Sequence, residues 1–318
     1  RITFNYAKND VNGRPAQSSN DPNILTSSIY TIPTTVDIND LKNNYEDDEG
    51  NQIFLSTDKD GNNPYWIVNK NQHNSTNNRF FGSGQISYKP IEWLTIEDNV
   101  GFDISHQLQH SFVRQGTAGD LKGSYEDYTL FQRRINNDFI VTAQKNLTPD
   151  FNLKVMVGNN ILDRSYSYTD IVASDLIIDN FYRPNNAASV STTEYFQQQR
   201  LVSLYGEVTG AYKDFAYLTL TGRNDFSSTL PTNNNSYFYP SISGSFVFSE
   251  FLPKDGFLSF GNVRLSYAQV GSDTDPYSLR TLYSAPSTYE LQFSVPGTFP
   301  FLGEQGFRSA QVYPAASL

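Results

Sequence analysis

The 318-residue sequence contains no cysteine, one methionine and two tryptophans. Without cysteine the chain has no disulfide framework, no thiolate metal site and no cysteine nucleophile. It also lacks any run of about 18 apolar residues, which excludes a protein that crosses a membrane with helices. Charged residues make up only 18% of the chain, and the net charge is −10. Nucleic acid is therefore not an expected partner, because its binding depends on neutralising phosphates with Lys and Arg.

Motifs for catalysis are missing as well. The sequence has no Gly-x-Ser-x-Gly elbow and no P-loop, and no pair of carboxylates stands out as a glycosidase dyad. Histidine is scarce, with only His73, His106 and His110. In a strand that rises about 3.3 Å per residue, His106 and His110 lie about 13 Å apart, which is too far for one metal ion. We therefore expect no catalytic residue, no metal site, no cofactor and no enzyme activity.

The clearest pattern lies in residues 201–271. Apolar or small residues alternate there with mostly polar ones, in four segments separated by turns. A period of two means that alternate side chains face different media, so four successive β-strands are expected. The apolar or small positions are Val202, Leu204, Gly206, Val208, Gly210 and Tyr212, then Leu218, Leu220 and Gly222, then Phe238, Ile242, Gly244, Phe246 and Phe248, then Val263, Leu265 and Tyr267.

Three features favour a membrane-spanning sheet over a soluble one. The strands are expected to be about ten residues long, the length that crosses a bilayer at a tilt. Turns alternate between short, as at Lys213 to Phe215, and long, as at Ser227 to Ser236. Aromatic residues such as Tyr212 and Phe238 gather at strand ends, where transmembrane barrels carry aromatic girdles.

The same alternation along the rest of the chain predicts about nine strands in total. The predicted fold is all-β: one partial domain, residues 1–318, of an antiparallel transmembrane β-barrel. Short connections fall on one side of the predicted sheet and long ones on the other. Transmembrane barrels place long loops outside the cell, so extracellular loops are expected near residues 8–78, 111–126, 169–195, 227–236 and 272–318.

Four motifs in this order resemble the barrel of SusC/RagA-type TonB-dependent outer-membrane transporters. They are Tyr205-Gly206-Glu207, Arg223-Asn224-Asp225-Phe226-Ser227-Ser228, Phe238-Tyr239-Pro240-Ser241, and Val263-Arg264-Leu265-Ser266-Tyr267 with the following residues to Gly271. The segments Asn63-Pro64-Tyr65-Trp66 and Pro90-Ile91-Glu92-Trp93 are also similar to that family. The resemblance is most specific between Tyr195 and Asp275.

The resemblance implies import of a nutrient, a glycan oligomer or a peptide, across the outer membrane of a Gram-negative, Bacteroidetes-like cell. The implied partners are a SusD-like surface lipoprotein, the TonB complex and outer-membrane lipid. Plugged transporters have about 22 strands, so about nine strands are well under half of a barrel. The sequence shows no signal peptide, no TonB-contacting segment, no plug and no terminal strand, so we expect it to be a piece of a longer protein.

Tyr65 and Trp66 are candidate substrate-binding residues in the long insert. Aromatic rings in such a loop can stack on a sugar ring or a peptide. The alternative is that both rings pack the loop onto the barrel.

Arg223 and Asp225 are the second candidate pair. They lie on the strand face opposite Leu220, which points them into the lumen or to its rim, because a charge facing lipid costs about 2–4 kcal/mol at mid-bilayer. There they are placed to touch substrate or plug. The alternative is a structural ladder with Glu207 and Arg264 on neighbouring strands.

The main alternative to a transporter is a soluble or surface-attached all-β module that binds carbohydrate or has a structural role. Such a module covers its apolar face with a second sheet. A barrel wall instead turns an uncharged apolar band about 25 Å tall towards lipid. A siderophore or cobalamin transporter of the same architecture is disfavoured by the four motifs.

Overall fold

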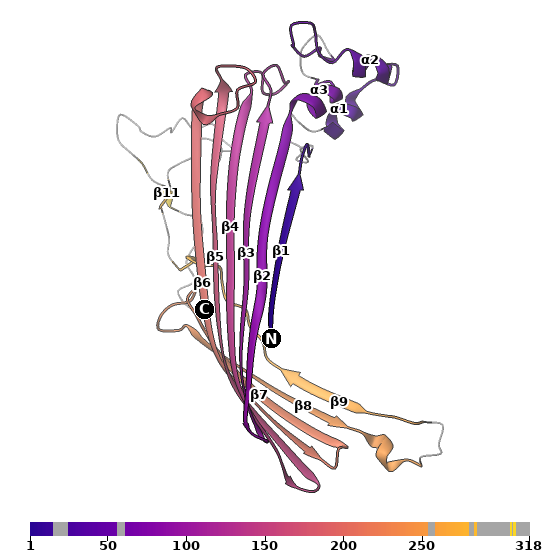
Figure 1. Cartoon of the computed structure of the whole chain (residues 1–318), viewed down its shortest axis with the longest axis vertical. Helices are drawn as coiled ribbons and strands as arrows, with labels where there is room; N and C mark the ends of the chain where they lie inside the picture. The colour runs from indigo at the N-terminus through magenta and orange to yellow at the C-terminus, as the bar shows by residue number, and fades with distance from the viewer. Residues whose placement is uncertain are drawn as a thin grey trace. The chain divides into compact units, whose positions relative to one another are not determined.

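The computed structural model describes residues 1–14, 25–55, 61–253, 258–279, 283–284, 306 and 308–309. Its main feature is a nine-stranded antiparallel sheet in which strands follow one another in chain order (Figure 1). The strands are β1 (Ile2–Val11), β2 (Gln72–Ile91), β3 (Leu94–Val113), β4 (Ser124–Thr148), β5 (Phe151–Leu176), β6 (Ala187–Tyr212), β7 (Ala216–Ser227), β8 (Ser236–Phe246) and β9 (Val263–Ala268). Two short strands, β10 (Tyr283–Ser284) and β11 (Arg308–Ser309), pair with each other. The predicted all-β class and the strand number are confirmed.

The chain forms two compact units. The first comprises Arg1–Gly84, Gly101–Ile135 and Arg164–Gln197, and the second comprises Gln85–Val100, Asn136–Asp163 and Gln198–Leu318. The first unit contains β1 and one part of each strand from β2 to β6. The second unit contains the other parts of these strands together with β7, β8 and β9.

Five strands are longer than the sequence analysis predicted. β2 and β3 have 20 residues each, β4 has 25, and β5 and β6 have 26 each, whereas about 9–11 residues cross a bilayer. The loop expected at 169–195 is therefore largely strand, and only residues 177–186 connect β5 to β6. Polar residues such as Ser, Thr, Asp and Asn are mixed there with Ala, Val, Ile and Tyr, so neither face is distinctly apolar. Its residues suit a strand, but no hydrophobic alternation marks it.

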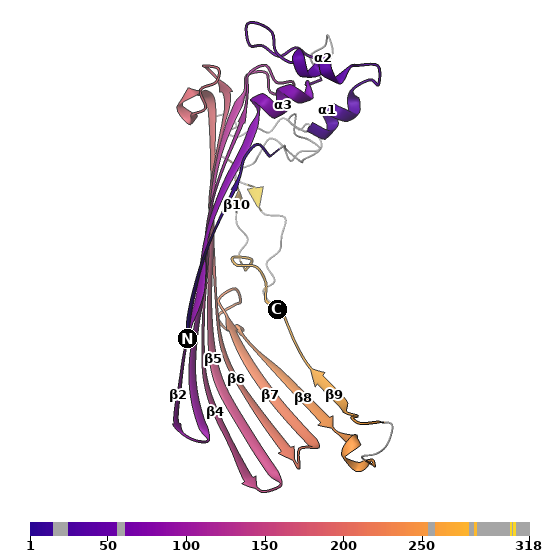
Figure 2. The ribbon, with the colours of Figure 1, turned by 45° about the vertical axis from the view of Figure 1, so that its right-hand side comes forward.

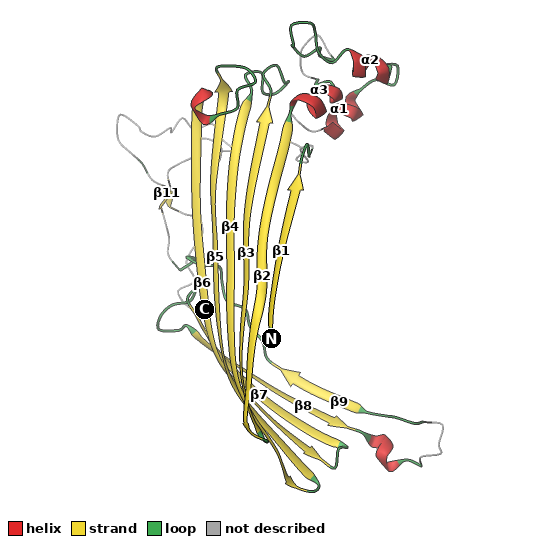
Figure 3. Ribbon diagram, viewed as in Figure 1, coloured by secondary structure: helices red, strands yellow, loops and turns green. Residues whose placement is uncertain are grey.

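The insert expected at residues 8–78 is likewise shorter. β1 continues to Val11, which pairs with Ser75 of β2. Between these strands the structure has three helices that the sequence analysis did not predict: α1 (Leu25–Thr31), α2 (Ile38–Asn43) and α3 (Pro64–Lys70) (Figure 3). The side chain of Asp37 caps α2, and Asn63 caps α3 ahead of Pro64 at its first turn, both familiar helix-start signals. None of the described helices is long and apolar enough to cross a membrane.

The connections that follow β6 and β8 in the second unit carry an aromatic cluster. Residues 213–215 join β6 to β7, as predicted, but the connection from β8 to β9 spans 247–262 and includes the 3₁₀ helix η2 (Phe248–Phe251). Phe215 packs edge-on against Tyr212, Phe246 and Phe251, with ring centres 4.9–5.8 Å apart. Aromatic residues therefore gather at this end of the strands, as a membrane girdle requires.

β9 ends earlier than predicted. The strand stops at Ala268 rather than Gly271, although the backbone N–H of Gln269 still donates to the carbonyl of Pro240 in β8 at 3.1 Å. Asp273 then accepts hydrogen bonds from Ser227 at 2.5 Å, Thr229 at 3.1 Å and Gln199 at 2.8 Å. Most of the last predicted loop, 272–318, lies outside the described residues.

The apolar positions of β6–β9 form one exposed face of the second unit. Twelve large apolar or aromatic side chains in these strands are 42–76% exposed. They are Leu204, Val208, Tyr212, Leu218, Leu220, Phe226, Phe238, Ile242, Phe246, Val263, Leu265 and Tyr267. In the described part of the chain no second sheet covers this face, which differs from the packing of a soluble β-sandwich.

Candidate functional site

Trp66 is fully buried in the first unit. Its indole N–H donates a hydrogen bond of 2.9 Å to the hydroxyl of Thr117, which lies between β3 and β4 and is also fully buried. The guanidinium of Arg114 and the ammonium of Lys70 lie 5.7 and 5.9 Å from the indole ring centre. No part of the ring is exposed, which favours the alternative that Trp66 packs the loop. Tyr65 is partly exposed and stays a candidate.

Asn62 links the insert to the connection between β3 and β4. Its side-chain oxygen accepts from the backbone N–H of Ala118 at 2.7 Å, and its amide nitrogen donates to the carbonyl of the same residue at 3.1 Å. Asn71 accepts from the backbone N–H of Arg114 at 2.9 Å. These buried amides satisfy backbone groups that a loop otherwise leaves unpaired, and they fasten the two segments together.

Arg114 extends the same contacts to the connection between β5 and β6. Two of its guanidinium nitrogens donate to one carboxylate oxygen of Asp179 at 3.0 and 3.2 Å. Nearby, the rings of Phe112 and Tyr182 stack with centres 4.8 Å apart. Burial raises the pKa of the Tyr182 hydroxyl, and the negative charge of Asp179 adds to this effect. We call residues 25–55, 61–71, 114–123 and 177–186 the loop module.

Arg223 and Asp225 contact each other in the second unit. The guanidinium donates to the Asp225 carboxylate at 2.7 Å and to the hydroxyl of Ser203, which is fully buried, at 2.8 Å. It also lies 5.7 Å from the ring centre of Tyr205. The predicted shared face is therefore correct, and the pair is tied into the wall by β6 residues.

Glu207 and Arg264 were expected to contact Arg223, but Arg223 has the other partners named above. Glu207 accepts a hydrogen bond of 3.1 Å from Lys154 of β5, and Arg264 lines a separate cavity. The difference follows from the antiparallel register, which places Arg223 opposite Tyr205 and brings Ser203 within reach.

Tyr205 occupies space that glycine provides on the neighbouring strand. A side chain at Gly158 of β5 would place its Cβ 2.2–2.6 Å from atoms of the Tyr205 ring. With no side chain there, the ring lies over β5, and its hydroxyl donates to Asp138 at 2.7 Å. Polar contacts therefore connect β4, β6 and β7 across the polar face.

We expect Gly158→Ala to destabilise the folded protein by about 1–3 kcal/mol, as overpacking does. The added methyl group displaces Tyr205 and weakens its contacts with Asp138 and Arg223. Chemical unfolding of the full-length protein in detergent measures the change. Gly84→Ala is the control, because a Cβ at Gly84 meets no atom within 4 Å. Equal unfolding midpoints for the two variants would contradict this assignment.

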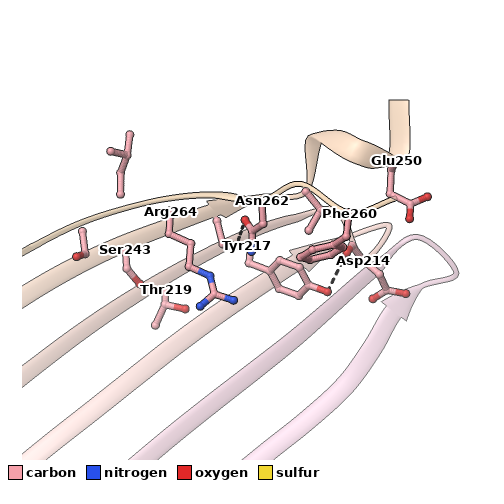
Figure 4. A pocket seen from close by; sticks show the side chains of 13 residues that line it. Asp214, Tyr217, Thr219, Ser243, Glu250, Phe260, Asn262 and Arg264 are labelled. Carbon is pink, nitrogen blue, oxygen red and sulfur yellow. Dashed lines mark hydrogen bonds between the residues drawn. The ribbon is translucent and has the colours of Figure 1, made fainter. Parts of the chain in front are cut away.

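A cavity of 710 Å³ lies beside the connections that follow β6 and β8 in the second unit (Figure 4). Its polar lining includes Arg264, whose guanidinium extends towards Thr219 and Tyr217 (Figure 4). The Tyr217 hydroxyl donates to the carbonyl of Asp214 at 2.9 Å. None of the four predicted site residues lines this cavity.

The sequence analysis missed the residues that join the loop module. Asn62 and Ala118 are 56 residues apart, and Arg114 and Asp179 are 65 apart. No local pattern reports a contact at such separations. The helix itself was detectable, since Asn63 followed by Pro64 is a helix-start signal.

Comparison with known proteins gives several matches and one negative result. No family model matches the chain. TonB-dependent receptor P26 of Formosa agariphila is 26% identical over 281 residues, which cover 82% of this chain and 27% of the receptor. TonB-dependent receptor P3 of the same organism is 23% identical over 250 residues, covering 74% of this chain and 24% of the receptor.

Solved structures of RagAB match the fold. The RagAB peptide importer in its closed-closed state has a TM-score of 0.72 at 14% identity, over 99% of this chain and 34% of that chain. Another RagAB peptide transporter structure has a TM-score of 0.64 at 16% identity, over 71% of this chain and 26% of that chain. The chain thus spans about a quarter to a third of the length of these proteins. They are named as receptors, a transporter and an importer, which supports the prediction that the chain is not an enzyme.

Proposed function

Taking the chain as a piece of a SusC/RagA-type TonB-dependent transporter, we propose that it forms part of the wall of an outer-membrane barrel that imports a nutrient. The nutrient is a glycan oligomer or a peptide. Import draws on TonB through parts of the protein outside this chain. The similarity to two TonB-dependent receptors supports the energy source.

The distribution of polarity in β6–β9 is the observation that carries this proposal. Leu204, Leu220 and Ile242 on one face are about half exposed. On the other face Ser203 is fully buried and Lys154 pairs with Glu207. A soluble monomer rarely exposes an apolar patch larger than a few hundred Å². Lipid on the apolar face removes the unfavourable hydration of these side chains.

The soluble module is the weaker alternative for the same reason. A carbohydrate-binding sandwich needs a second sheet on the apolar face, and the strands of the second unit that contribute to this face form a single layer (Figure 2).

The loop module is the proposed contact surface for a SusD-like lipoprotein. Its segments are fixed to one another by Asn62, Trp66 and Arg114, so it presents a preorganised surface, which reduces the entropy lost on binding. The long connections that form it belong on the extracellular side of a barrel, where a surface lipoprotein resides.

Uptake by living cells tests the proposed function. Cells that carry the full-length protein and its lipoprotein partner are given radiolabelled glycan oligomers and peptides. We expect uptake of one class, abolished by deletion of the transporter gene, by loss of TonB or by a protonophore. Uptake that continues without TonB would contradict the energy source, and a protein recovered in the soluble fraction would contradict the transporter.

A further inference from the structure

A row of tyrosines crosses three neighbouring strands in the first unit. Tyr128 of β4 and Tyr195 of β6 both stack on Tyr168 of β5, with ring centres 5.6 and 5.4 Å away and ring planes inclined by 30° and 21°. Tyr166 meets Tyr168 and Tyr195 edge-on at 6.0 and 6.1 Å. We call these four residues the tyrosine row. The formation of these strands does not by itself require four aromatic rings on a polar part of the sheet.

The tyrosine row lies on the polar face of the strands. Along the unbroken strand β5, Tyr166 and Tyr168 have the same parity as Lys154, and along β6, Tyr195 has the same parity as Glu207. Alternate residues of a strand share a face, and Lys154 and Glu207 contact each other on the face opposite the exposed apolar side chains. In a barrel wall this is the luminal face.

Tyr195 is the accessible end of the row. It is 41% exposed, because β7 pairs with β6 only from Leu201 onwards, and among the described residues no strand covers β6 beside Tyr195. One face of its ring contacts Tyr168. Its hydroxyl donates to the side-chain oxygen of Gln197 at 3.1 Å.

An unpartnered acceptor lies near Tyr128, one member of the row. Asp170 is two residues beyond Tyr168 on the same face and interacts electrostatically with Tyr128. Its buried carboxylate oxygen Oδ1 has no hydrogen-bond partner in the described part of the chain. A buried acceptor left without a donor is unfavourable, so such a group usually marks a missing partner.

We propose that the tyrosine row and Asp170 form a subsite for a pyranose glycan chain on the luminal wall, an inference that rests on the import function proposed above. A sugar ring has an apolar C–H face that packs on the Tyr195 ring and hydroxyl groups that donate to a carboxylate. Phenol rings supply apolar contact and a polar edge together, and an ionised Asp accepts several hydrogen bonds. A peptide would instead bind by pairing with the open backbone edge of β6, and this mode depends on neither the Tyr195 ring nor the Asp170 carboxylate.

Binding of the purified full-length transporter and its lipoprotein to a glycan array and to an array of random decapeptides tests this subsite. We expect binding to at least one pyranose oligomer. Tyr195→Ala is expected to weaken it about tenfold or more, which corresponds to the loss of one aromatic contact, and Asp170→Asn to weaken it as well. Tyr88→Ala is the matched control, because Tyr88 of β2 is a 63% exposed tyrosine of the second unit that belongs neither to the row nor to the loop module. Heat-modifiable gel mobility verifies that each variant is folded.

Several outcomes would overturn the subsite. They are binding to peptides alone, no binding to any glycan, or equal glycan affinity for the wild type and the folded Tyr195→Ala and Asp170→Asn variants. Failure of the subsite can be distinguished from failure of the proposed import function. TonB-dependent uptake that is insensitive to Tyr195→Ala refutes the subsite and leaves import intact, whereas Tyr195-dependent glycan binding without TonB-dependent uptake refutes import and leaves the subsite intact.

Discussion

Ile242→Arg is expected to destabilise the folded full-length protein by about 2–4 kcal/mol, the effect of an arginine on the lipid face of a barrel. Ile242 is 46% exposed and lies between Leu220 of β7 and Tyr267 of β9 in the register of the sheet. In the proposed barrel its side chain contacts lipid tails, which cannot solvate a guanidinium. The measurement is the fraction of protein with heat-modifiable gel mobility in outer membranes, together with its unfolding midpoint in urea.

The neighbouring residue provides a matched control for this substitution. Ser243 follows Ile242 on the same strand, but its side chain is on the opposite face and lines the 710 Å³ cavity (Figure 4). An arginine at Ser243 has room and water there, so Ser243→Arg should change stability far less. If the two arginines were equally tolerated, or if Ser243→Arg were the more damaging, the assignment of the two faces would be wrong.

Trp66→Ala is expected to destabilise the folded loop module by about 3–5 kcal/mol, the usual effect of removing a buried tryptophan side chain. The substitution leaves a cavity in the core around Trp66 and Ile67, and it removes the hydrogen bond to Thr117 and the contacts with Arg114 and Lys70. The insert should then separate from the connection between β3 and β4. Limited proteolysis of intact cells reports this as faster cleavage of the insert.

Tyr65→Ala serves as the comparison for Trp66→Ala, since Tyr65 is on the same turn of α3 but is partly exposed. We expect it to leave protease resistance nearly unchanged. Heat-modifiable mobility should be normal in both variants, because the strands do not depend on the insert. Equal cleavage of both variants would refute the central packing role of Trp66.

Much of the fold was predictable from local sequence. Leu218, Leu220 and Ile242 alternate with polar residues, and only a strand places every second residue on one face. The extension of β5 and β6 was not predictable in this way, because Tyr166 and Tyr168 alternate with serines, and neither face is distinctly apolar. Hydrophobic alternation detects the part of a strand that has one apolar face and does not detect a part in which neither face is distinctly apolar.

The candidate site was predictable only in part. Arg223 and Asp225 were placed on the polar face by the same alternation, and they do contact each other. The partners of Trp66 and Arg114 lie 51 and 65 residues away in the sequence, where only tertiary structure brings them together. The tyrosine row was missed because its members come from three strands and share no motif.

Fluorescence quenching at consecutive positions of β7 tests the barrel wall most directly. The chain has no cysteine, so single cysteines at Leu218, Thr219, Leu220 and Thr221 can be labelled with a fluorophore in a cysteine-free full-length protein. After refolding into vesicles that contain nitroxide-labelled lipids, we predict strong quenching at Leu218 and Leu220 and weak quenching at Thr219 and Thr221. Uniform quenching, or quenching of the threonine positions instead, would contradict a transmembrane wall with this orientation.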